Sequence, residues 1–489
     1  MENTTSNKLL FNETSPESVG IPSQAVMNFY KELEKDGFCM HGIMLIKNSQ
    51  VFAEGYYAPF HKESPHRMYS VGKSFTSAAI GLLQEEGKLS LADKISSYFP
   101  DKLPKEGLHP YIERATIRDL LCMASPHSYT TYKQVNDGDW VKSFFTVKPT
   151  RYPGTTFAYD TSATHVLSAL VERLSGMSLL DYLKVKVLNE LECSDQIRWL
   201  TCPMGICQGG SGLICTLRDV AKFAYTCMNG GRYDGKQLLP ETYIKEATSF
   251  QISTCLQPYT EEQQGYGYQF WQSRDDGFVL YGMGGQLAVC LPKQDFMMVT
   301  MADNLTNPNG VQGIYDALWQ HIYPYLIEQE VTALPENNSL LDELRITLCN
   351  LKLPVEKGEK KSKQASYIDG KVYHLADNPM GITQCSLTFS EEEGVFSYSN
   401  ESGANTLKFG LLSMTEQKFP GTEYTCTSSA AWVTENMLHL RTYIIDECYG
   451  SVNMTMTFQE NTITLAMKKA SEPFLQKYEG HASGEVMKA

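Results

Sequence analysis

The chain has 489 residues, and its 42 Lys and Arg residues against 56 Asp and Glu residues give a formal net charge of −14. This acidic balance argues against nucleic acid or an anionic membrane surface as a partner. No run of the sequence approaches the ~18 apolar residues of a membrane-spanning helix. A hydrophobic share of 42% with ordinary numbers of Gly and Pro excludes a disordered or collagen-like chain. The sequence therefore predicts a soluble globular protein.

The thirteen cysteines are odd in number and sparse for the length, which argues against a disulfide framework. Cys202 and Cys207 have a spacing that suits half a zinc site, but no second pair of ligands follows. We therefore expect buried reduced thiols and no metal. Residues 1–11 lack the apolar core of a secretion signal, and together these features favour a cytoplasmic location.

The first 330 residues mix strand and helix patterns. Residues 41–57 predict two short strands around a polar turn, and residues 277–304 predict a sheet. Apolar residues recur at helical spacing over residues 70–86 and 161–175, and each of these stretches is followed by a glycine. Residues 314–326 predict a closing helix that Pro324 interrupts.

The composition changes after residue 330. Residues 331–365 predict one further helix and a charged, apolar-free linker at residues 356–363. Residues 366–489 hold short strand-like runs separated by Gly, Asn, Asp and Glu, which predict a separate all-β domain, either a small sandwich or a barrel.

The sharpest motif is the segment MYSVGKSF, which begins at Met68. It places Ser70 in the first turn of the predicted helix and Lys73 one turn later, so both side chains share a helix face. A serine hydroxyl needs a base within hydrogen-bond reach to act as a nucleophile, and a desolvated lysine has its pKa lowered toward the useful range. A capped helix with a surface lysine is the alternative reading of the tetrapeptide alone.

Further blocks follow in order, namely TIRDLLCMASPH from Thr116, PGTTFAYDTSATHVLSALVERLSG from Pro153, GGSGLICTLRDVAKFA from Gly209 and YGMGGQLAVCLP from Tyr281. With these blocks the chain resembles the serine β-lactamase-like family, in particular its class C, penicillin-binding-protein and esterase branch. The resemblance covers most of residues 15–330. It implies an antiparallel sheet with helices on its faces, a helical region beside it, and an active site between the two.

The resemblance also implies catalytic roles. The family's catalytic tyrosine matches Tyr159, which would share a proton with Ser70 and act as general base and later as general acid. Asp160 and Ser162 are predicted to cap the following helix instead of acting as catalytic acids. Without the resemblance, Tyr159 would be interpreted as a packed aromatic residue.

The family's third motif, Lys-Thr-Gly or a variant with His, matches Met283, Gly284 and Gly285, so the cationic group is missing here. The backbone N–H of Gln286 is the predicted second oxyanion donor beside that of Ser70. A flexible strand or turn without a catalytic role remains the alternative for this segment.

Two departures from the family pattern bear on the substrate. Thr161 replaces the usual Asn of the second motif, and Met283 replaces Lys or His of the third. In the family, the replaced Asn and the replaced Lys or His contact the amide and the carboxylate of a β-lactam. Their replacement therefore argues against β-lactams as substrates more than it argues against acyl transfer.

Other residues carry weaker signals. His41, His127 and His165 lack paired ligand spacing, so structural or surface roles are expected. By resemblance, five aromatic residues flank the cleft, with core packing as the alternative for each: Tyr132, Trp140, Phe144, Phe145 and Trp271.

These observations predict a serine hydrolase that cleaves an ester or amide bond of a small molecule through an acyl-enzyme on Ser70, without a metal or an organic cofactor. Three alternatives remain open: a peptidase or amidase acting on short or D-amino-acid peptides, a β-lactamase, and a catalytically silent binding protein of the same fold. The sequence makes no prediction of oligomeric state.

Overall fold

The computed structural model describes residues 11–327 and 333–486, so the predicted boundary at residues 330 and 331 and the N-terminal residues 1–10 lie outside the described part. The chain forms two compact units, Met1–Leu351 and Lys352–Ala489. The first unit reaches Leu351 because helix α12 (Asn338–Cys349) packs on α1 (Ser23–Lys35) and β3 (Gln50–Tyr56).

A seven-stranded sheet forms the base of the first unit. It is antiparallel except for the parallel pair of β1 and β3. The strands run across the sheet in the order β1 (Asn12–Glu13), β3, β2 (Met40–Lys47), β12 (Phe296–Ala302), β11 (Gln286–Leu291), β10 (Phe278–Gly282) and β9 (Trp271–Gln272). The strands predicted at residues 41–57 and 277–304 are confirmed as β2, β3, β10, β11 and β12.

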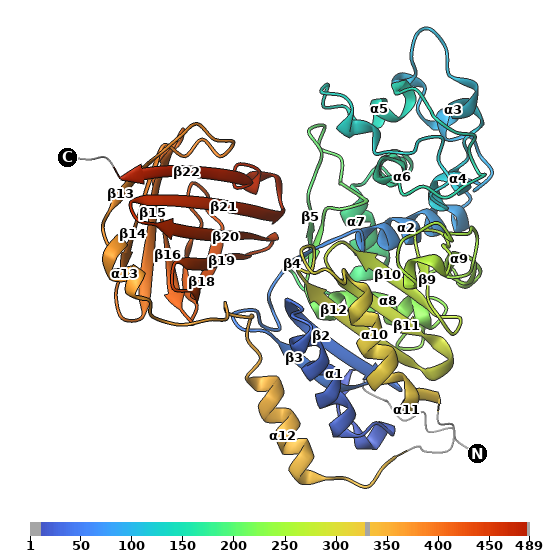
Figure 1. The fold of residues 1–489 in the computed structure, drawn as a ribbon. Coiled ribbons are helices and arrows are strands. Elements are labelled where there is room, and N and C mark those ends of the chain that lie inside the picture. Colours follow the sequence, from blue (N-terminus) through green and yellow to red (C-terminus); the bar gives the residue numbers. More distant parts are fainter. Residues whose placement is uncertain (1–10, 328–332, 487–489) are drawn as a thin grey trace. The chain divides into compact units, whose positions relative to one another are not determined.

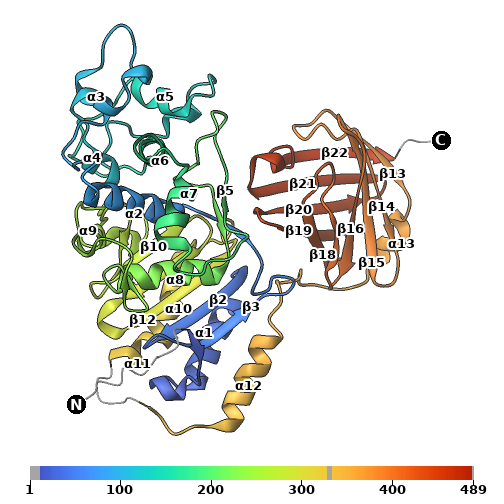
Figure 2. The same ribbon diagram turned by 180° about the vertical axis from the view of Figure 1, so that it is seen from behind.

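Helices cover both faces of this sheet. Figure 1 and Figure 2 show α1 and α10 (Gln312–His321) on one face and α8 (Leu217–Met228) on the other, and α8 contacts β11 and β12. The predicted closing helix is confirmed, and it is split at Ile322 into α10 and α11 (Tyr323–Ile327), whose second residue is Pro324.

A helical region stands beside the sheet and is built around α2 (Gly72–Glu85) and α6 (Thr161–Ser175), which pack against each other. Phe75 of α2 stacks on Phe223 of α8 at 3.6 Å between ring centroids and so joins this region to the sheet. The remaining helices of the first unit are short: α3 (Pro110–Arg114), α4 (Ile117–Leu121), α5 (Trp140–Thr146), α7 (Leu179–Leu183) and α9 (Glu241–Ala247).

Two small sheets complete the first unit. Strands β4 (His66–Tyr69), β6 (Leu213–Cys215) and β5 (Arg198–Trp199) form one, and β7 (Arg232–Tyr233) and β8 (Lys236–Gln237) form the other. The antiparallel pairing of β4 with β6 sets Tyr69 opposite Leu213. It therefore brings the segment before α2 next to the glycine-rich segment before β6.

The second unit is a ten-stranded sheet that closes into a barrel, because β16 also pairs in parallel with β18. The strands follow one another in the order β16 (Gly403–Leu411), β15 (Glu393–Asn400), β14 (Gln384–Phe389), β13 (Val372–Leu375), β22 (Gly480–Val486), β21 (Thr462–Ser471), β20 (Tyr449–Gln459), β19 (Met437–Ile445), β18 (Thr425–Thr434) and β17 (Thr415–Lys418). The predicted β-rich C-terminal domain is confirmed. Because its sheet closes on itself, the domain is a barrel and not a sandwich.

The charged run at residues 356–363 is tied to this barrel. The backbone groups of Glu359 and Trp432 exchange hydrogen bonds of 2.8 and 2.9 Å, and the Glu356 carboxylate pairs with Arg441 at 2.9 Å. Helix α13 (Lys363–Ile368) follows at once and packs against β14. The segment predicted as a linker therefore contributes to the barrel unit.

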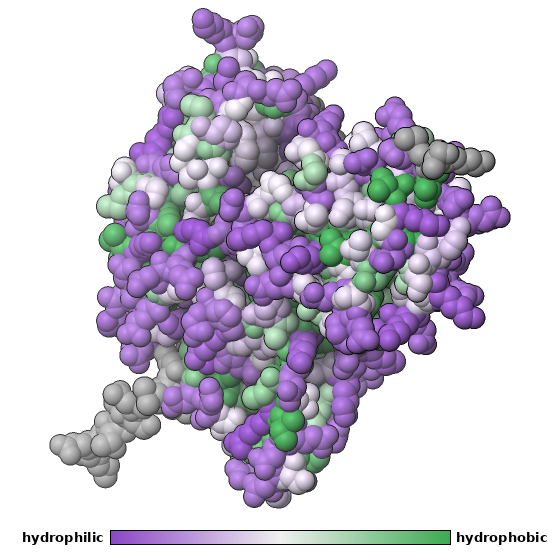
Figure 3. All heavy atoms as spheres, turned by 90° about the vertical axis from the view of Figure 1, so that its left-hand side faces the viewer, coloured by the Kyte–Doolittle hydropathy of each residue, from purple (hydrophilic) through white to green (hydrophobic). Residues whose placement is uncertain are grey.

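On the face drawn in Figure 3, hydrophilic residues predominate and hydrophobic residues form small separate groups. Among the described residues, no helix is long and apolar enough to cross a membrane.

Candidate active site

The sequence predicts Ser70 in the first turn of a helix, but the structure places it in the tight turn between β4 and α2. Helix α2 begins at Gly72, and the Lys73 backbone N–H donates to the Ser70 carbonyl at 3.1 Å. Tyr69, directly before Ser70, has a φ of 47°, in the left-handed region that non-glycine residues rarely adopt. This strained turn holds the half-buried Ser70 side chain at the end of the strand.

The Lys73 ammonium lies at the centre of the site. Its Nζ donates hydrogen bonds to Ser70 Oγ at 2.9 Å, to Thr161 Oγ1 at 3.3 Å and to the Gly210 carbonyl oxygen at 2.6 Å. The Lys73 side chain is 1% exposed. Ser70 and Lys73 thus lie within hydrogen-bond reach of each other, and their catalytic roles stay a prediction.

Burial lowers the pKa of Lys73 to about 7, with a further lowering by the positive charge of Lys133 and an opposing effect of the Asp160 carboxylate. Desolvation favours the neutral amine because it penalises the charged form. Near neutral pH a large fraction of Lys73 is therefore able to accept a proton.

Gly210 is the site residue to which the sequence assigned no role. The β4–β6 pairing brings its carbonyl to Lys73, and a Cβ at this position would lie 3.1 Å from Nζ and 2.7 Å from Thr161 Cγ2. The backbone comes this close to Lys73 because residue 210 has no side chain. The block GGSGLI that contains Gly210 was visible in the sequence, but a backbone acceptor leaves no residue-type signal.

Tyr159 lies beside Lys73, as predicted. The Lys73 Nζ is 4.8 Å from the centroid of the Tyr159 ring, and the ring stacks on Trp271 at 5.8 Å. Burial raises the pKa of Tyr159, and the neighbouring Ser70 hydroxyl partly offsets that rise. Among the described residues, no group makes a hydrogen bond of good geometry with the buried Tyr159 hydroxyl.

The capping role of Asp160 is confirmed, whereas Ser162 is the second residue of α6 and supplies the backbone N–H that is capped. Asp160 is the N-cap of α6, and its side chain accepts from the Ser162 backbone N–H at 2.9 Å and from Ser125 Oγ at 2.8 Å. Thr161, the first residue of α6, accepts a hydrogen bond from Lys73. Contact of Thr161 with substrate stays a prediction.

Met283, Gly284 and Gly285 form the turn between β10 and β11, and not a strand. Gly284 and Gly285 have φ values of 84° and 105°, which favour glycine at both positions. A Cβ on Gly282, the last residue of β10, would lie 2.4 Å from the Met68 carbonyl oxygen. The end of β10 therefore lies directly beside β4, the strand that precedes Ser70.

Gln286, the first residue of β11, uses its side chain to hold this turn. Its Nε2 donates to the carbonyls of Met283 at 2.8 Å and Ala302 at 2.7 Å, and its Oε1 accepts from the Ala302 N–H at 3.0 Å. The role of its backbone N–H as an oxyanion donor stays a prediction.

The five aromatic residues predicted to flank the cleft separate into three groups. Phe144 and Phe145 are fully buried in the core, Trp271 stacks on Tyr159, and Tyr132 stacks on Trp140 at 4.0 Å. For Phe144 and Phe145 the core alternative therefore holds.

The three histidines singled out in the sequence are buried within the first unit. His41 Nδ1 and His66 Nε2 lie 2.9 Å apart, and the His127 ring nitrogen is 2.8 Å from the Phe144 carbonyl. His165 makes ring contacts with Tyr132 and Trp140. Over the described residues, no group of three or more His, Cys, Asp and Glu side chains is arranged to hold a metal ion.

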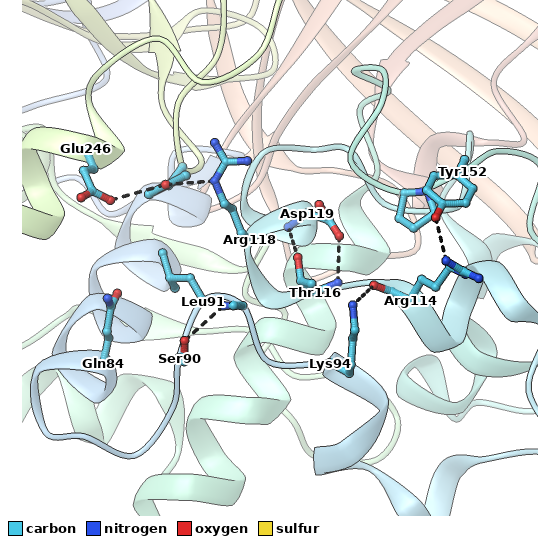
Figure 4. A pocket seen from close by; sticks show the side chains of 13 residues that line it. Gln84, Ser90, Leu91, Lys94, Arg114, Thr116, Arg118, Asp119, Tyr152 and Glu246 are labelled. Carbon is cyan, nitrogen blue, oxygen red and sulfur yellow. Dashed lines mark hydrogen bonds between the residues drawn. The ribbon is translucent and has the colours of Figure 1, made fainter.

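A pocket of about 670 Å³ lies elsewhere, at the C-terminal end of α2 (Figure 4). Its cations are engaged in hydrogen bonds: Lys94 donates to the Arg114 carbonyl at 2.8 Å and Arg114 to the Tyr152 hydroxyl at 3.1 Å. Since Ser70 precedes the N-terminus of α2, this pocket is separate from the Ser70 site.

The fold and the site together define a protein of the serine β-lactamase-like class. The Beta-lactamase family model matches residues 41–320. The chain therefore belongs to the Beta-lactamase family, within the serine hydrolase superfamily.

Individual relatives are distant. The chain is 23% identical over 288 residues to a 6-aminohexanoate-dimer hydrolase of Paenarthrobacter ureafaciens, which covers 54% of this chain and 72% of the relative. It is 27% identical over 177 residues to the protein flp of Staphylococcus aureus, covering 33% of this chain and 35% of the relative. The structure of EstCE1, a hydrolase with promiscuous acyltransferase activity, superposes with a TM-score of 0.51 at 17% identity, over 61% of this chain and 98% of EstCE1. At this identity the structural likeness supports the fold alone.

Proposed function

We propose that the protein is a serine hydrolase that cleaves an ester or amide bond of a small molecule through an acyl-enzyme on Ser70. The observation that carries the proposal is the 2.9 Å contact between Ser70 Oγ and the buried amine of Lys73, whose pKa is lowered by desolvation to about 7. A weak nucleophile and a matched base within hydrogen-bond reach are the two requirements for attack by a serine.

In acylation, neutral Lys73 accepts the Ser70 hydroxyl proton while Ser70 Oγ bonds to the carbonyl carbon. The tetrahedral intermediate collapses when the bond from that carbon to the leaving oxygen or nitrogen breaks. Tyr159 donates its phenolic proton to the leaving atom, and the Lys73 ammonium returns a proton to Tyr159. Because burial raises the pKa of Tyr159, the phenol is protonated before the reaction and has a proton to give.

In deacylation, water attacks the acyl carbon and gives up a proton through the same pair of groups. The bond from the acyl carbon to Ser70 Oγ breaks, the acid leaves and the serine hydroxyl is restored. The backbone N–H groups of Ser70 and Gln286 hold the oxyanion in both steps. The contact of Gly282 with the Met68 carbonyl supports this pairing because it brings the two segments together. These steps use groups of the chain itself and require no cofactor.

Amide hydrolysis is the second candidate activity. It is supported by the name of a relative at 23% identity, a 6-aminohexanoate-dimer hydrolase, because a dimer of an amino acid is joined by an amide bond. Hydrolysis of β-lactams is disfavoured because residue 283 is Met and residue 161 is Thr.

A panel of p-nitrophenyl acyl esters, aminoacyl anilides and nitrocefin tests the substrate class, with Ser70→Ala as the control. We expect turnover of esters or anilides that is lost in Ser70→Ala. Dominant turnover of nitrocefin would contradict the assignment to esters and amides. Absence of turnover with all three would support a silent binding protein.

We also propose a cytoplasmic location. All thirteen cysteines lie in the described part of the chain and none forms a disulfide, which supports a reducing compartment.

A further inference from the structure

A half-buried carboxylate without a cationic partner lies near Tyr159. Glu262, in the short helix η6 (Glu261–Gln263), accepts a hydrogen bond from the Tyr281 hydroxyl at 3.0 Å. Among the described residues, no Lys, Arg or His lies within ion-pair distance of Glu262, although its neighbour Glu261 pairs with Arg274. A carboxylate removed from water in this way gains from a cation, because its own partner here is a neutral hydroxyl.

Aromatic rings connect Glu262 to the site. The ring centroids of Tyr281 and Trp271 are 5.8 Å apart, and Trp271 stacks on Tyr159 at the same distance. After burial and the opposing effect of Ser70, the charge of Glu262 is the next influence on the pKa of Tyr159, so this carboxylate acts on the site electrostatically.

Trp271 adds a second, independent observation. Its side chain is 7% exposed, and its Nε1 has no hydrogen-bond acceptor among the described residues. A buried indole N–H normally finds a partner. The indole N–H can only donate, so it points to a hydrogen-bond acceptor supplied from outside the chain, such as a carbonyl oxygen of the substrate.

The charge at this edge of the site is opposite to the family pattern. The resemblance predicts Lys or His at position 283, but Met283 is uncharged and Tyr281, two residues earlier, holds the Glu262 carboxylate. An anionic substrate group is thus disfavoured here, and a carboxylate beside aromatic rings is the arrangement that recognises ammonium groups.

We propose that the substrate carries a primary ammonium group, which binds at Glu262 beside the rings of Tyr281 and Trp271. The inference rests on the proposed function, since it concerns the substrate that acylates Ser70. The substrate class is therefore an amine-bearing ester or amide, and Glu262 determines the preference for it.

Matched alkyl fluorophosphonates test this inference. Probes of equal chain length that end in an ammonium, a methyl or a carboxylate group are compared by the rate at which they label Ser70, in a series of chain lengths. We expect the ammonium probe to label about tenfold faster than the methyl probe at the favoured length, a factor that corresponds to one ion pair in a half-buried position.

Two variants of Glu262 and one control variant test whether Glu262 causes the preference for the ammonium probe. In Glu262→Gln the amide still accepts from Tyr281, so the charge is removed with little change in shape, and the ammonium-to-methyl ratio should fall toward one. In Glu262→Lys the carboxylate probe should overtake the ammonium probe. Glu246→Gln is the matched control, since Glu246 also faces a tyrosine hydroxyl, that of Tyr268 at 3.5 Å, but lines the separate pocket of Figure 4, and it should keep the wild-type ratio.

The outcomes separate the two proposals. Labelling of Ser70 with equal rates for the three probes, or with a ratio that Glu262→Gln leaves unchanged, overturns the ammonium site alone. Fastest labelling by the carboxylate probe overturns it in favour of an anionic substrate, with Lys133 as the cation to test next. Failure of every probe to label folded protein overturns the proposed function, and the ammonium site with it.

Discussion

The Lys73 ammonium donates a 2.6 Å hydrogen bond to the carbonyl oxygen of Gly210, a residue 137 positions further along the chain. The β4–β6 pairing fixes this contact, which orients the amine toward Ser70. The amine is thus oriented by a backbone group, and among the described residues no carboxylate forms an ion pair with it. The following consequences can be measured, besides the reaction at Ser70 itself.

The rate of Ser70 acylation should rise with pH through a midpoint of about 7. The pKa of Lys73 is lowered to about 7 by burial, so the amine is protonated and inactive as a base below this pH and neutral above it. The measurement is the labelling rate with an uncharged fluorophosphonate between pH 5 and pH 10. A midpoint near the ordinary lysine value of about 10.4 would contradict the role of Lys73.

Asp160→Asn provides a matched variant for the pH profile. The Asp160 charge opposes the lowering of the Lys73 pKa, so its removal should move the midpoint to lower pH. Asn also caps helices well, which limits the loss of stability. A midpoint that moves upward would show that another group controls the profile.

Tyr159→Phe should reduce kcat by about 100-fold, the usual contribution of a positioned acid-base group. The buried ring remains in place, so its packing on Trp271 is retained while the proton donor is lost. Steady-state kinetics on the best substrate of the panel provide the measurement. Tyr129→Phe, at a residue that is 70% exposed, is the control. A Tyr159→Phe variant within about threefold of wild type removes Tyr159 from the mechanism.

Lys73→Met should abolish activity and stabilise the first unit by about 1–3 kcal/mol at pH 7, since a desolvated ammonium is removed while the Gly210 carbonyl loses its donor. The penalty that Lys73 imposes is complete below its folded pKa of about 7. It is lost as the pH rises toward the unfolded value of about 10.4, so the difference between the proteins should shrink in alkaline solution. Urea unfolding of both proteins at two pH values measures this difference in stability. A variant that is less stable than wild type at pH 7 would contradict the account.

Gly210→Ala should slow acylation by about tenfold or more and cost about 1–3 kcal/mol, because the added methyl group collides with Thr161 and displaces Lys73. Labelling rates and thermal unfolding report the two effects. Gly205→Ala is the control in the same segment: its φ of 82° makes alanine strained, but no atom lies within 4 Å of the added Cβ. It should lose stability while its labelling rate stays at the wild-type value.

Local patterns in the sequence predict much of the framework. The helical spacing of apolar residues and the glycines that follow give α2 and α6 within about two residues, and the Ser70–Lys73 spacing places two side chains of the site correctly. The turn before α2 is not predicted, because the positive φ of Tyr69 is imposed by the pairing of β4 with β6.

Contacts between distant segments are the part that the sequence does not predict. The Gly210 acceptor is a backbone group, which no residue type marks. Glu262 is one glutamate among many until folding brings the Tyr281 hydroxyl to it and sets Trp271 beside Tyr281. Closure of the barrel depends on the parallel pairing of β16 with β18, which the alternation of apolar residues along each strand does not encode.

The central claim is that Ser70 is the nucleophile. Wild-type protein incubated with a fluorophosphonate probe should carry one label, mapped by mass spectrometry to the peptide that contains Ser70, and Ser70→Ala of unchanged thermal stability should carry none. A label on another residue, or equal labelling of Ser70→Ala, would contradict the account.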